Sequence, residues 1–405
     1  MSSTLSKPSS PVVPLLLSMS ISQLSLGLIG PLVPLLLLAA GADAREIGTV
    51  TSCFAVGFII GTLTLGNLVR RVGHRATFAA MTGLAMLAAL AMTTLHGAVA
   101  WAVLRGCLGI AHAGFCIVVE SWLNSYATNR SRGKIFSAYM LVNWAGTMVG
   151  PLAISGFSAS PFLLVAAAIG LLVGVPPLLL SKARPPPPPS ARRMGLRGLW
   201  VISPVGLACC ATAGLCNGVL YALSPVPLAA RGFDQSSIAL FLFGLNVAGM
   251  AIQLPLGLLA DRFGRRAVVV TALGIGTVLG LLLHGATLPG WGLFIALAGM
   301  AMTSSGMYGL GSGQTNDRLA ELSQGGGDTV AASGGLLLAW AIGAAIGPML
   351  AGVTMDAAGA SAMFLYLSAV MGTVATFTAM RMVLRSDAPR TPRAAVLDGT
   401  PAGRG

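Results

Sequence analysis

The sequence predicts an all-α membrane protein with twelve transmembrane helices in two pseudo-symmetric six-helix bundles. Three observations predict this fold class. Hydrophobic residues make up 55% of the 405-residue chain and charged residues only 9%, whereas soluble domains contain roughly 25% charged residues. Apolar runs of about 20 residues, long enough to cross the hydrocarbon core of a bilayer, recur along the chain. In addition, one segment of the first half returns in the second half.

The returning segment is GNLVRRVGHRA from Gly66 and GLLADRFGRRA from Gly257. Aligned without gaps, Gly73 meets Gly264, which gives an offset of 191 residues. Other features recur at nearly that offset: Trp101 as Trp291, GPLVP at 30–34 as SPVP at 224–227, and GTMVGP at 146–151 as GAAIGP at 343–348. A tandem duplication of apolar helices is typical of transporters built from two similar bundles around one site.

The apolar runs give six spans in each half. In the first half they are 13–40, 48–69, 76–95, 98–124, 134–157 and 161–181. In the second half they are 200–229, 236–260, 267–286, 291–316, 329–354 and 361–383. The first run lacks a small-residue cleavage site before a polar segment, so we expect a retained helix rather than a signal peptide. The predicted organisation is a bundle at 1–181, a Pro/Arg-rich linker at 182–199, a bundle at 200–384 and a tail at 385–405.

Lysine and arginine predict the orientation, because both are enriched in cytoplasmic loops. One set of loops and the two termini hold 21 of the 24 basic residues, whereas the opposite loops hold only Arg45 and Arg231. Both termini and the linker are therefore expected in the cytoplasm. Arginine-rich, Ala/Gly-rich usage indicates a GC-rich bacterial genome, and the expected location is the bacterial inner membrane. This asymmetry and the attraction of membrane lipids explain the net charge of +13, so we do not expect nucleic-acid binding.

The two copies of the repeated segment resemble a loop signature of the major facilitator superfamily, G-x-L-a-D-r-x-G-r-R, which lies between its second and third helices. The second copy matches it at Gly257, Leu259, Ala260, Asp261, Arg262, Gly264, Arg265 and Arg266. The first copy departs from it at Arg70, where the family has aspartate. The resemblance covers about residues 11–385 and implies the fold of that family.

The resemblance also implies a cytoplasmic gate. In the family, the aspartate of this signature is thought to lie against the N-terminus of a helix in the other half, where the helix dipole favours an anion. The predicted gating residues, including those argued from the fourth span below, are Glu120, Arg71, Arg75, Gly257, Asp261, Arg262, Gly264 and Arg266. A positive charge at Arg70 would invert the dipole interaction, and whether this weakens the first-half gate stays open.

Three further segments carry the resemblance. WAVLRGCLGIAHA, from Trp101, is similar to the family's fourth-helix motif, whose arginine is implicated in proton coupling and corresponds to Arg105. GxxxGP at 146–151 is similar to a fifth-helix antiporter pattern, but its recurrence at 343–348 also fits a packing role. ESWLNSYATNRSRGK, from Glu120, is similar to a bacterial branch of YcaD-like transporters.

Polar residues within the spans indicate which helices line a pathway, because such residues are costly in lipid and usually face a cavity or a partner. Apart from His284 at the end of the ninth, the third, sixth and ninth spans contain no Asn, Gln, His, Trp, Tyr or charged residue, so these helices are expected at the periphery. The predicted substrate or proton pathway comprises Gln23, Arg105, His112, Asn143, Trp144, Asn217, Tyr221, Asn246, Tyr308 and Trp340.

The fourth span has the densest chemistry, since Arg105, His112 and Glu120 share one helix face. For Arg105 we expect a role in substrate or proton coupling, with hydrogen bonds to neighbouring carbonyls as the alternative. His112 fits either a proton carrier or a packed, hydrogen-bonded histidine. Glu120 is expected to pair with loop arginines such as Arg71, Arg75 or Arg132 in the gate rather than to carry protons.

These features predict a secondary active transporter that moves a small organic solute by alternating access, with protons as the coupling ion. Export of an amphiphilic or drug-like compound is slightly favoured, because the pathway has few hydrogen-bonding groups. The alternative is an uptake symporter for a small polar or anionic metabolite with Arg105 as the counter-charge; a non-transporting receptor is a third reading. No paired carboxylates, nucleophile motif or CxxC pair indicates an enzyme, a cofactor or a metal site, and a monomer is expected.

Overall fold

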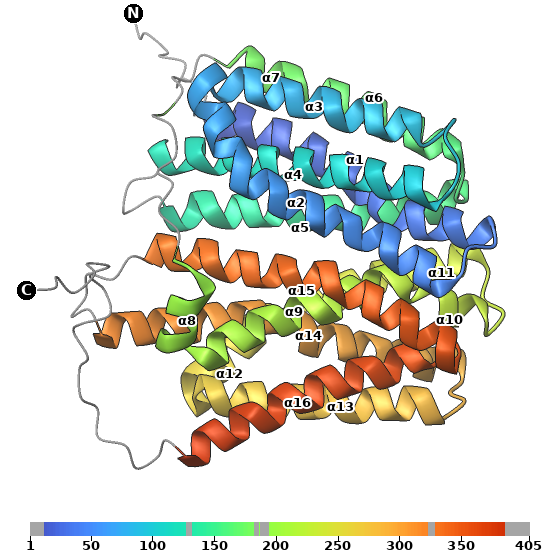
Figure 1. Cartoon of the computed structure of the whole chain (residues 1–405), viewed down its shortest axis with the longest axis vertical. Coiled ribbons are helices and arrows are strands. Elements are labelled where there is room, and N and C mark those ends of the chain that lie inside the picture. The colour runs from blue at the N-terminus through green and yellow to red at the C-terminus, as the bar shows by residue number, and fades with distance from the viewer. Residues whose placement is uncertain (1–11, 127–131, 182–185, 187–193, 323–328, 385–405) are drawn as a thin grey trace, which may run out of the picture. The chain divides into compact units, whose positions relative to one another are not determined.

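The computed structural model describes residues 12–126, 132–181, 186, 194–322 and 329–384 (Figure 1). Within this part of the chain all regular structure is helical, as predicted. In order, the helices are α1 (Val12–Ala39), α2 (Ala44–Val72), α3 (His74–Ala91), α4 (Ala98–Tyr126), α5 (Arg132–Phe157), α6 (Pro161–Val173), α7 (Val175–Leu179), α8 (Leu196–Ile202), α9 (Pro204–Leu223), α10 (Pro225–Ala229), α11 (Gln235–Ala251), α12 (Gln253–Phe263), α13 (Arg265–Gly285), α14 (Gly290–Leu322), α15 (Thr329–Ala358) and α16 (Ala362–Leu384).

Eleven helical segments in the described residues are long and apolar enough to cross a membrane. The third predicted span corresponds to α3, whose 18 residues include His74 and Arg75 at the start. These two side chains lower its mean hydropathy, so α3 is not among the eleven. The segments 161–179, 204–229 and 235–263 each consist of two helices. Prolines lie at or just after each interruption, where they remove a backbone donor from the helix.

Contacts divide the chain into two compact units. Unit 1 contains Met1–Ala191, Val219–Val247 and Pro348–Ala360, and unit 2 contains Arg192–Gly218, Ala248–Gly347 and Ser361–Gly405. Parts of α9, α11 and α15 therefore group with the helices of the first half. The predicted boundaries at 181 and 200 stay a prediction. Most of the predicted linker and nearly all of the tail lie outside the described residues.

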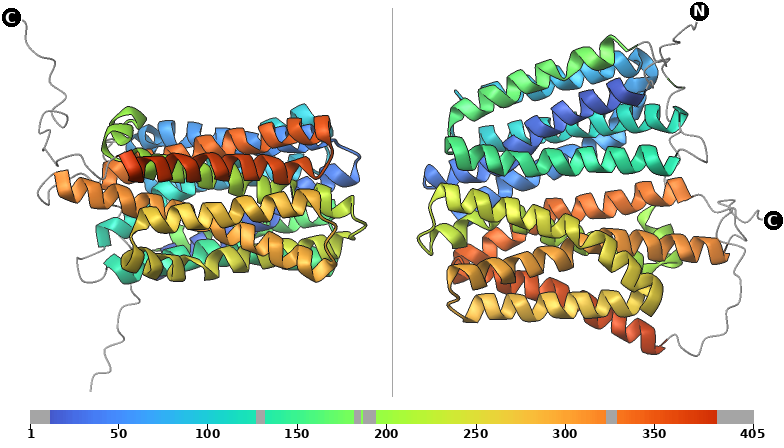
Figure 2. Two further views of the ribbon diagram at one scale, coloured as in Figure 1. Left: turned by 90° about the horizontal axis from the view of Figure 1, so that it is seen from below. Right: turned by 180° about the vertical axis from the view of Figure 1, so that it is seen from behind.

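In unit 1, α2 packs along α4 and α1 packs along α5, while α3 packs against α4 and α6 (Figures 1 and 2). Small residues allow the close approach of α2 and α4. A Cβ atom at Gly57 would overlap the backbone of Gly106, and one at Gly109 would overlap the carbonyl oxygen of Phe54. Close backbone contact of this kind drives helix association where lipid provides no hydrophobic force.

In unit 2, α13 packs along α16 and α14, and α12 packs against α13 and α14. A buried cluster joins α8, α9, α14 and α15; its members are Leu199, Cys210, Leu319, Ala332 and Leu336. Tyr308 is among the partly buried residues that pack against this cluster. The cluster holds the C-terminal end of α14, which carries several charged residues.

The duplication seen in the sequence is reproduced by the backbone. Gly41 and Gly232, at the repeat offset, both have φ of 85°, a conformation that glycine adopts without steric cost. Two residues later, Asp43 accepts a hydrogen bond from the backbone N–H of Glu46 at 2.7 Å, and Asp234 accepts one from Ser237 at 3.3 Å. The same Gly-x-Asp turn therefore starts α2 and α11, with aspartate as the N-cap.

The repeated GxxxGP pattern packs helices in both halves. Gly146 and Gly150 of α5 lie against the backbone of α1 at Gln23 and Gly27, where any side chain would overlap it. In the same way, Gly343 and Gly347 of α15 lie against α9 at residues 211–215. Since both copies make equivalent contacts, helix packing accounts for the pattern.

Candidate functional site

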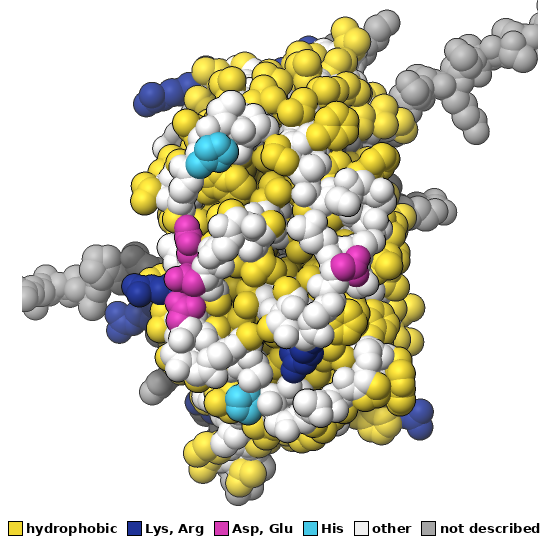
Figure 3. Space-filling view, turned by 90° about the vertical axis from the view of Figure 1, so that its right-hand side faces the viewer, with side chains coloured by type: hydrophobic (Ala, Val, Ile, Leu, Met, Phe, Trp, Pro, Cys, Tyr) yellow, Lys and Arg dark blue, Asp and Glu magenta, His cyan; other side chains and the backbone are white. Residues whose placement is uncertain are grey.

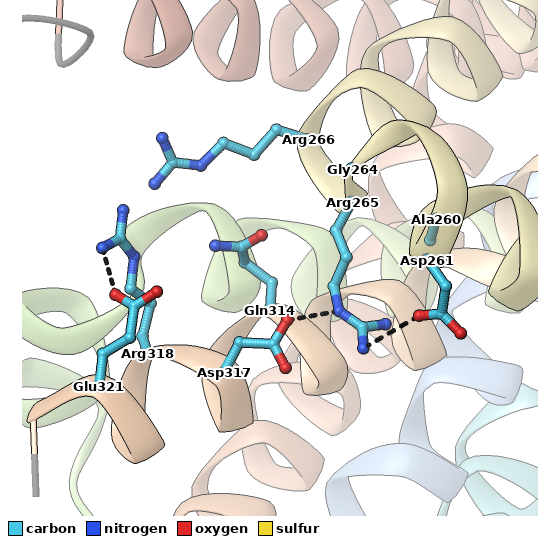
Figure 4. Close-up of a pocket in the computed structure, with 9 residues that line it drawn as sticks. All are labelled: Ala260, Asp261, Gly264, Arg265, Arg266, Gln314, Asp317, Arg318 and Glu321. Carbon is cyan, nitrogen blue, oxygen red and sulfur yellow. Dashed lines mark hydrogen bonds and ion pairs between the residues drawn. The ribbon is translucent and has the colours of Figure 1, made fainter. Parts of the chain in front are cut away.

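A charged pocket of about 420 Å³ lies in unit 2 where α12 ends, α13 begins and α14 ends (Figure 4). Its lining residues are Ala260, Asp261, Gly264, Arg265, Arg266, Gln314, Asp317, Arg318 and Glu321. The ion pairs recorded among the described residues all lie here: Arg265 with Asp317 at 2.7 Å, Arg265 with Asp261 at 3.7 Å, and Arg318 with Glu321 at 2.7 Å.

Arg265 is the centre of this network. Gly264 has φ of 86° and separates α12 from α13, so Asp261 and Arg265 face each other across the turn. The Arg265 Nε donates to Asp317 of α14, and Figure 4 shows its guanidinium between the two carboxylates. Gly313 leaves the space for this side chain, since a Cβ atom there would overlap the guanidinium. The loop is thus tied to α14 by a charge-assisted hydrogen bond.

Of the predicted gating residues in the second half, Asp261, Gly264 and Arg266 line the pocket, whereas Gly257 and Arg262 do not. The Arg262 guanidinium instead lies 5.2 Å from the centre of the Phe263 ring. The prediction missed Arg265, Asp317, Arg318 and Glu321 as site residues. The charged sequence NDRLAEL at the end of α14 could have pointed to them, but the partner of Asp317 lies 52 residues away along the chain.

The first-half copy of this loop is held by hydrogen bonds and ring contacts. His74, which aligns with Arg265, lies 3.0 Å from the hydroxyl of Ser121 on α4, and its ring centre is 5.6 Å from that of Trp122. Arg75 lies over the same Trp122 ring at 6.0 Å and donates to the carbonyl of Ser181. An imidazole and an indole therefore take the place of the second-half ion pair.

Arg70, at the position of the family's aspartate, donates to the side chain of Asn67 one turn earlier in α2. Arg71 is exposed at the end of that helix. The described part of this copy has no ion pair, so the two halves hold the loop by different interactions.

Glu120 accepts a hydrogen bond from the hydroxyl of Tyr139 on α5 at 2.9 Å. The expected pairing with Arg71 or Arg75 is absent from the described ion pairs, and the side chain of Arg132 lies outside the described residues. The reason is geometric: Tyr139 of α5 faces Glu120, while Arg75 is directed to Trp122 and Ser181.

Arg105 and His112 face α2 in the described unit. Arg105 is 5% exposed, and its guanidinium carbon lies 4.8 Å from the centre of the Phe54 ring. The His112 ring lies between Phe54 at 5.7 Å and Phe58 at 5.5 Å. The Arg105 Nε and both His112 ring nitrogens are buried with no hydrogen-bond partner among the described residues. The alternative of a packed, hydrogen-bonded His112 therefore finds no partner in this structure.

Gln23 and Asn143 meet between α1 and α5. The Gln23 amide donates to the Asn143 side-chain oxygen, and the Asn143 amide donates to the carbonyl of Tyr139 at 2.9 Å. Because Tyr139 also donates to Glu120, a chain of hydrogen-bonded residues links α1, α5 and α4. Trp144, the next residue of α5, is half-buried.

The second-half pathway residues fall in different units. Asn246, in unit 1, donates to the Leu242 carbonyl of its own helix at 2.9 Å, and Tyr221 belongs to the same unit. Asn217, Tyr308 and Trp340 belong to unit 2. The side-chain oxygen Oδ1 of Asn217 is buried without a described hydrogen-bond partner. That the ten pathway residues line one cavity stays a prediction.

Unit 1 also contains a contact that the sequence did not predict. A Cβ atom at Gly48 of α2 would overlap the Pro348 carbonyl of α15, and the Arg45 backbone N–H lies 3.4 Å from the Asp356 carboxylate. In the same unit α11 meets α5, where the Ser236 hydroxyl donates to the Ser155 carbonyl at 2.9 Å. These residues lie at the helix ends predicted to face outward, and Figure 3 shows that charged side chains are sparse on the face bearing the α1–α2 turn.

A comparison with protein families matches the model of the Major Facilitator Superfamily to residues 15–325 and again to 206–403. The chain belongs to this superfamily. It is therefore a multi-pass membrane transporter, and the expected fold class is confirmed. The second match begins inside the second half of the chain.

Curated relatives support the assignment to the superfamily. The chain is 28% identical over 383 residues to an uncharacterized MFS-type transporter YcaD of Escherichia fergusonii, covering 93% of this chain and 96% of the relative. It is also 28% identical over 389 residues to YcaD of Salmonella typhimurium, covering 94% and 97%. The resemblance to the YcaD-like branch is thus confirmed.

Solved transporters share the fold. The nucleoside transporter NupG matches with a TM-score of 0.73 and 13% identity, covering 92% of this chain and 99% of NupG. A bacterial homolog of the human lysosomal transporter Spinster, in an inward-facing and unoccupied conformation, matches with a TM-score of 0.69 and 14% identity, covering 93% and 96%. At these identities the similarity concerns the fold alone.

Proposed function

We propose that this superfamily member is a secondary active transporter that moves a small organic solute across the bacterial inner membrane by alternating access, coupled to protons. The observation that carries the proposal is the pair of unpartnered polar side chains on α4, Arg105 and His112. An arginine inside a membrane-spanning helix costs at least about 2.5–3.5 kcal/mol. Such a cost favours a functional role over an idle residue.

Export of an amphiphilic or drug-like compound is the favoured direction and substrate type. Aromatic rings surround the two polar groups, with Phe54 against both and Phe58 against His112. Apolar and aromatic walls with few polar groups are typical of sites for such ligands. The second candidate is uptake of a small polar or anionic metabolite, which is favoured by the absence of an acidic partner for Arg105 among the described ion pairs.

Alternating access requires contacts that form and break on each side of the membrane. On the cytoplasmic side we assign this role to the loop of Asp261 and Arg265 with Asp317. On the outer side we assign it to the contact of Gly48 with Pro348. The positive-inside distribution supports this assignment of sides, with both termini in the cytoplasm.

The test is flux through purified protein in proteoliposomes, after ligands have been found by thermal shift, since a binder raises stability by RT ln(1 + [L]/Kd). We expect saturable flux that a proton gradient drives and a protonophore abolishes. Arg105→Lys should fail nearly as badly as Arg105→Ala, because lysine lacks the planar fork of donors. Saturable binding without flux in either direction would instead indicate a receptor.

A further inference from the structure

We propose that Phe54 is the positioning residue of the pathway: it holds Arg105 by its aromatic face, so that the cation stays uncompensated and binds the anionic group of an organic substrate. This inference rests on the proposed transport function and narrows the substrate class. Nothing in the sequence had singled out Phe54, because a phenylalanine in an apolar span is expected to pack against lipid or a neighbouring helix.

The charge of Arg105 has no acidic partner in the described structure. The recorded ion pairs all lie in the unit 2 pocket. The acid on the same helix, Glu120, is about 22 Å further along the axis at 1.5 Å per residue and accepts from Tyr139. A carboxylate beside Arg105 would cancel its charge, whereas a ring face attracts the cation and leaves the charge in place.

The geometry leaves the donors of Arg105 available to a ligand. The guanidinium carbon lies over the Phe54 ring, 4.8 Å from its centre, and the Nε has no described hydrogen-bond partner. The N–H groups of a guanidinium point outward in its plane, and two of them match the oxygens of a carboxylate or phosphate. Holding the side chain in one orientation lowers the entropy lost on binding.

The position of Phe54 is itself fixed by the contact of α2 with α4. Its carbonyl lies against Gly109, one turn of helix beyond Arg105, where any Cβ atom would overlap it. The Phe54 ring also lies 5.7 Å from the His112 ring, and Leu108, next to Gly109 in α4, is fully buried. Since these surroundings are apolar, the site suits an anionic group attached to an apolar body. The substrate class is thus an organic anion, for either direction of transport.

The experiment compares matched anionic and neutral probes on purified full-length protein. Binding of benzoate against benzamide, and of phenyl phosphate against phenol, is measured by thermal shift and calorimetry. The variants are Phe54→Leu, Phe54→Tyr and Arg105→Gln. Phe78→Leu is the matched control, because Phe78 of α3 also packs on α4, where its ring lies 5.0 Å from that of Phe115, ten residues beyond Arg105.

We expect the anions to bind more tightly than their neutral partners, and Arg105→Gln to remove this selectivity. Phe54→Leu should weaken anion binding roughly 3- to 30-fold, the range of a cation–π contact. Phe54→Tyr should keep it, because the ring face remains, and Phe78→Leu should keep it as well. Rescue by tyrosine separates the role of the ring from simple packing.

Equal binding of anions and neutral partners by the wild type would overturn the inference, and so would anion selectivity that persists in Arg105→Gln. An equal loss in Phe78→Leu and Phe54→Leu would show a packing effect and also reject the inference. The proposed function is tested separately. If anions bind selectively but are not moved in the flux assay, the inferred anion site stands and the proposed transport function is rejected. Flux of neutral solutes without flux of anions would keep the transport function and reject the inferred substrate class.

Discussion

Ser158 lies in the turn between α5 and α6 with φ of 59°, a left-handed conformation otherwise recorded only for glycines among the described residues. The equivalent turn between α15 and α16 has Gly359 with φ of 86°. An L-residue in this conformation is strained by about 1–2 kcal/mol, whereas glycine adopts it freely but loses more entropy on folding. The second copy of the fold therefore has the residue that suits the turn.

Ser158→Gly is expected to stabilise the protein by up to about 1 kcal/mol, the difference between relieved strain and added chain entropy. The measurement is the thermal midpoint of the purified protein. Ser158→Ala is the control, since alanine keeps the strain. A midpoint that falls in Ser158→Gly would mean that the serine side chain contributes more than the turn conformation costs.

At the scale of elements, the two copies of the cytoplasmic loop differ in chemistry. The second copy joins Asp261, Arg265 and Asp317 through ion pairs, while the first joins His74 to Ser121. In both copies the following helix, α3 or α13, begins after a glycine with φ near 85°, Gly73 or Gly264. The backbone of the repeat is thus retained, and the side chains that connect it to the fourth helix of each half have diverged.

Asp261→Asn is predicted to cut transport strongly while expression and ligand binding stay largely intact. Losing the carboxylate removes a partner of Arg265 and, by the family resemblance, the anion favoured at a helix N-terminus. The matched variant in the other copy is Arg70→Asp, which restores the family's usual residue and should be tolerated. Normal flux through Asp261→Asn in proteoliposomes would remove this loop from the gate.

A second element-scale prediction concerns the contact of α2 with α15. Gly48→Leu should prevent this contact, because any side chain there meets the Pro348 carbonyl. Gly83 has open space where its Cβ would lie, so Gly83→Leu is the control. A disulfide between Ser155→Cys and Ser236→Cys, formed by oxidation, reports the closed outer side. The disulfide should form in the protein that carries the two cysteines and native Gly48, and its yield should fall when Gly48→Leu is added. Unchanged cross-linking and flux would contradict the assignment.

For the whole molecule, the distribution of basic residues predicts the orientation in the membrane. Accessibility tags at Ser158 or Asp234 should be labelled from outside intact cells. Tags at Ser190 or Ala388 should react only after permeabilisation. A tag at Ser190 that reacts in intact cells would show the opposite orientation. The cytoplasmic and outer roles assigned to the two sets of contacts would then be exchanged.

The sequence by itself determined that this protein lies in a lipid membrane, that it is helical and that its two halves are repeats. These follow from local properties: hydropathy over about 20 residues predicts a span, and Gly73 and Gly264 mark the repeat whatever surrounds them. The helix interruptions at Gly174, Ser224 and Ile252 were less visible, since the apolar runs continue through them. The superfamily was recognisable because its signature is contiguous in the chain.

Only the tertiary structure decided which side chains meet. Arg265 pairs with Asp317 rather than remaining a surface charge, Glu120 takes Tyr139 in place of an arginine, and Arg105 lies on Phe54 without an acid. Helix periodicity places residues on a face of their own helix. It does not say which residue of which neighbour covers that face, because close contacts such as Gly109 with Phe54 set the register between helices.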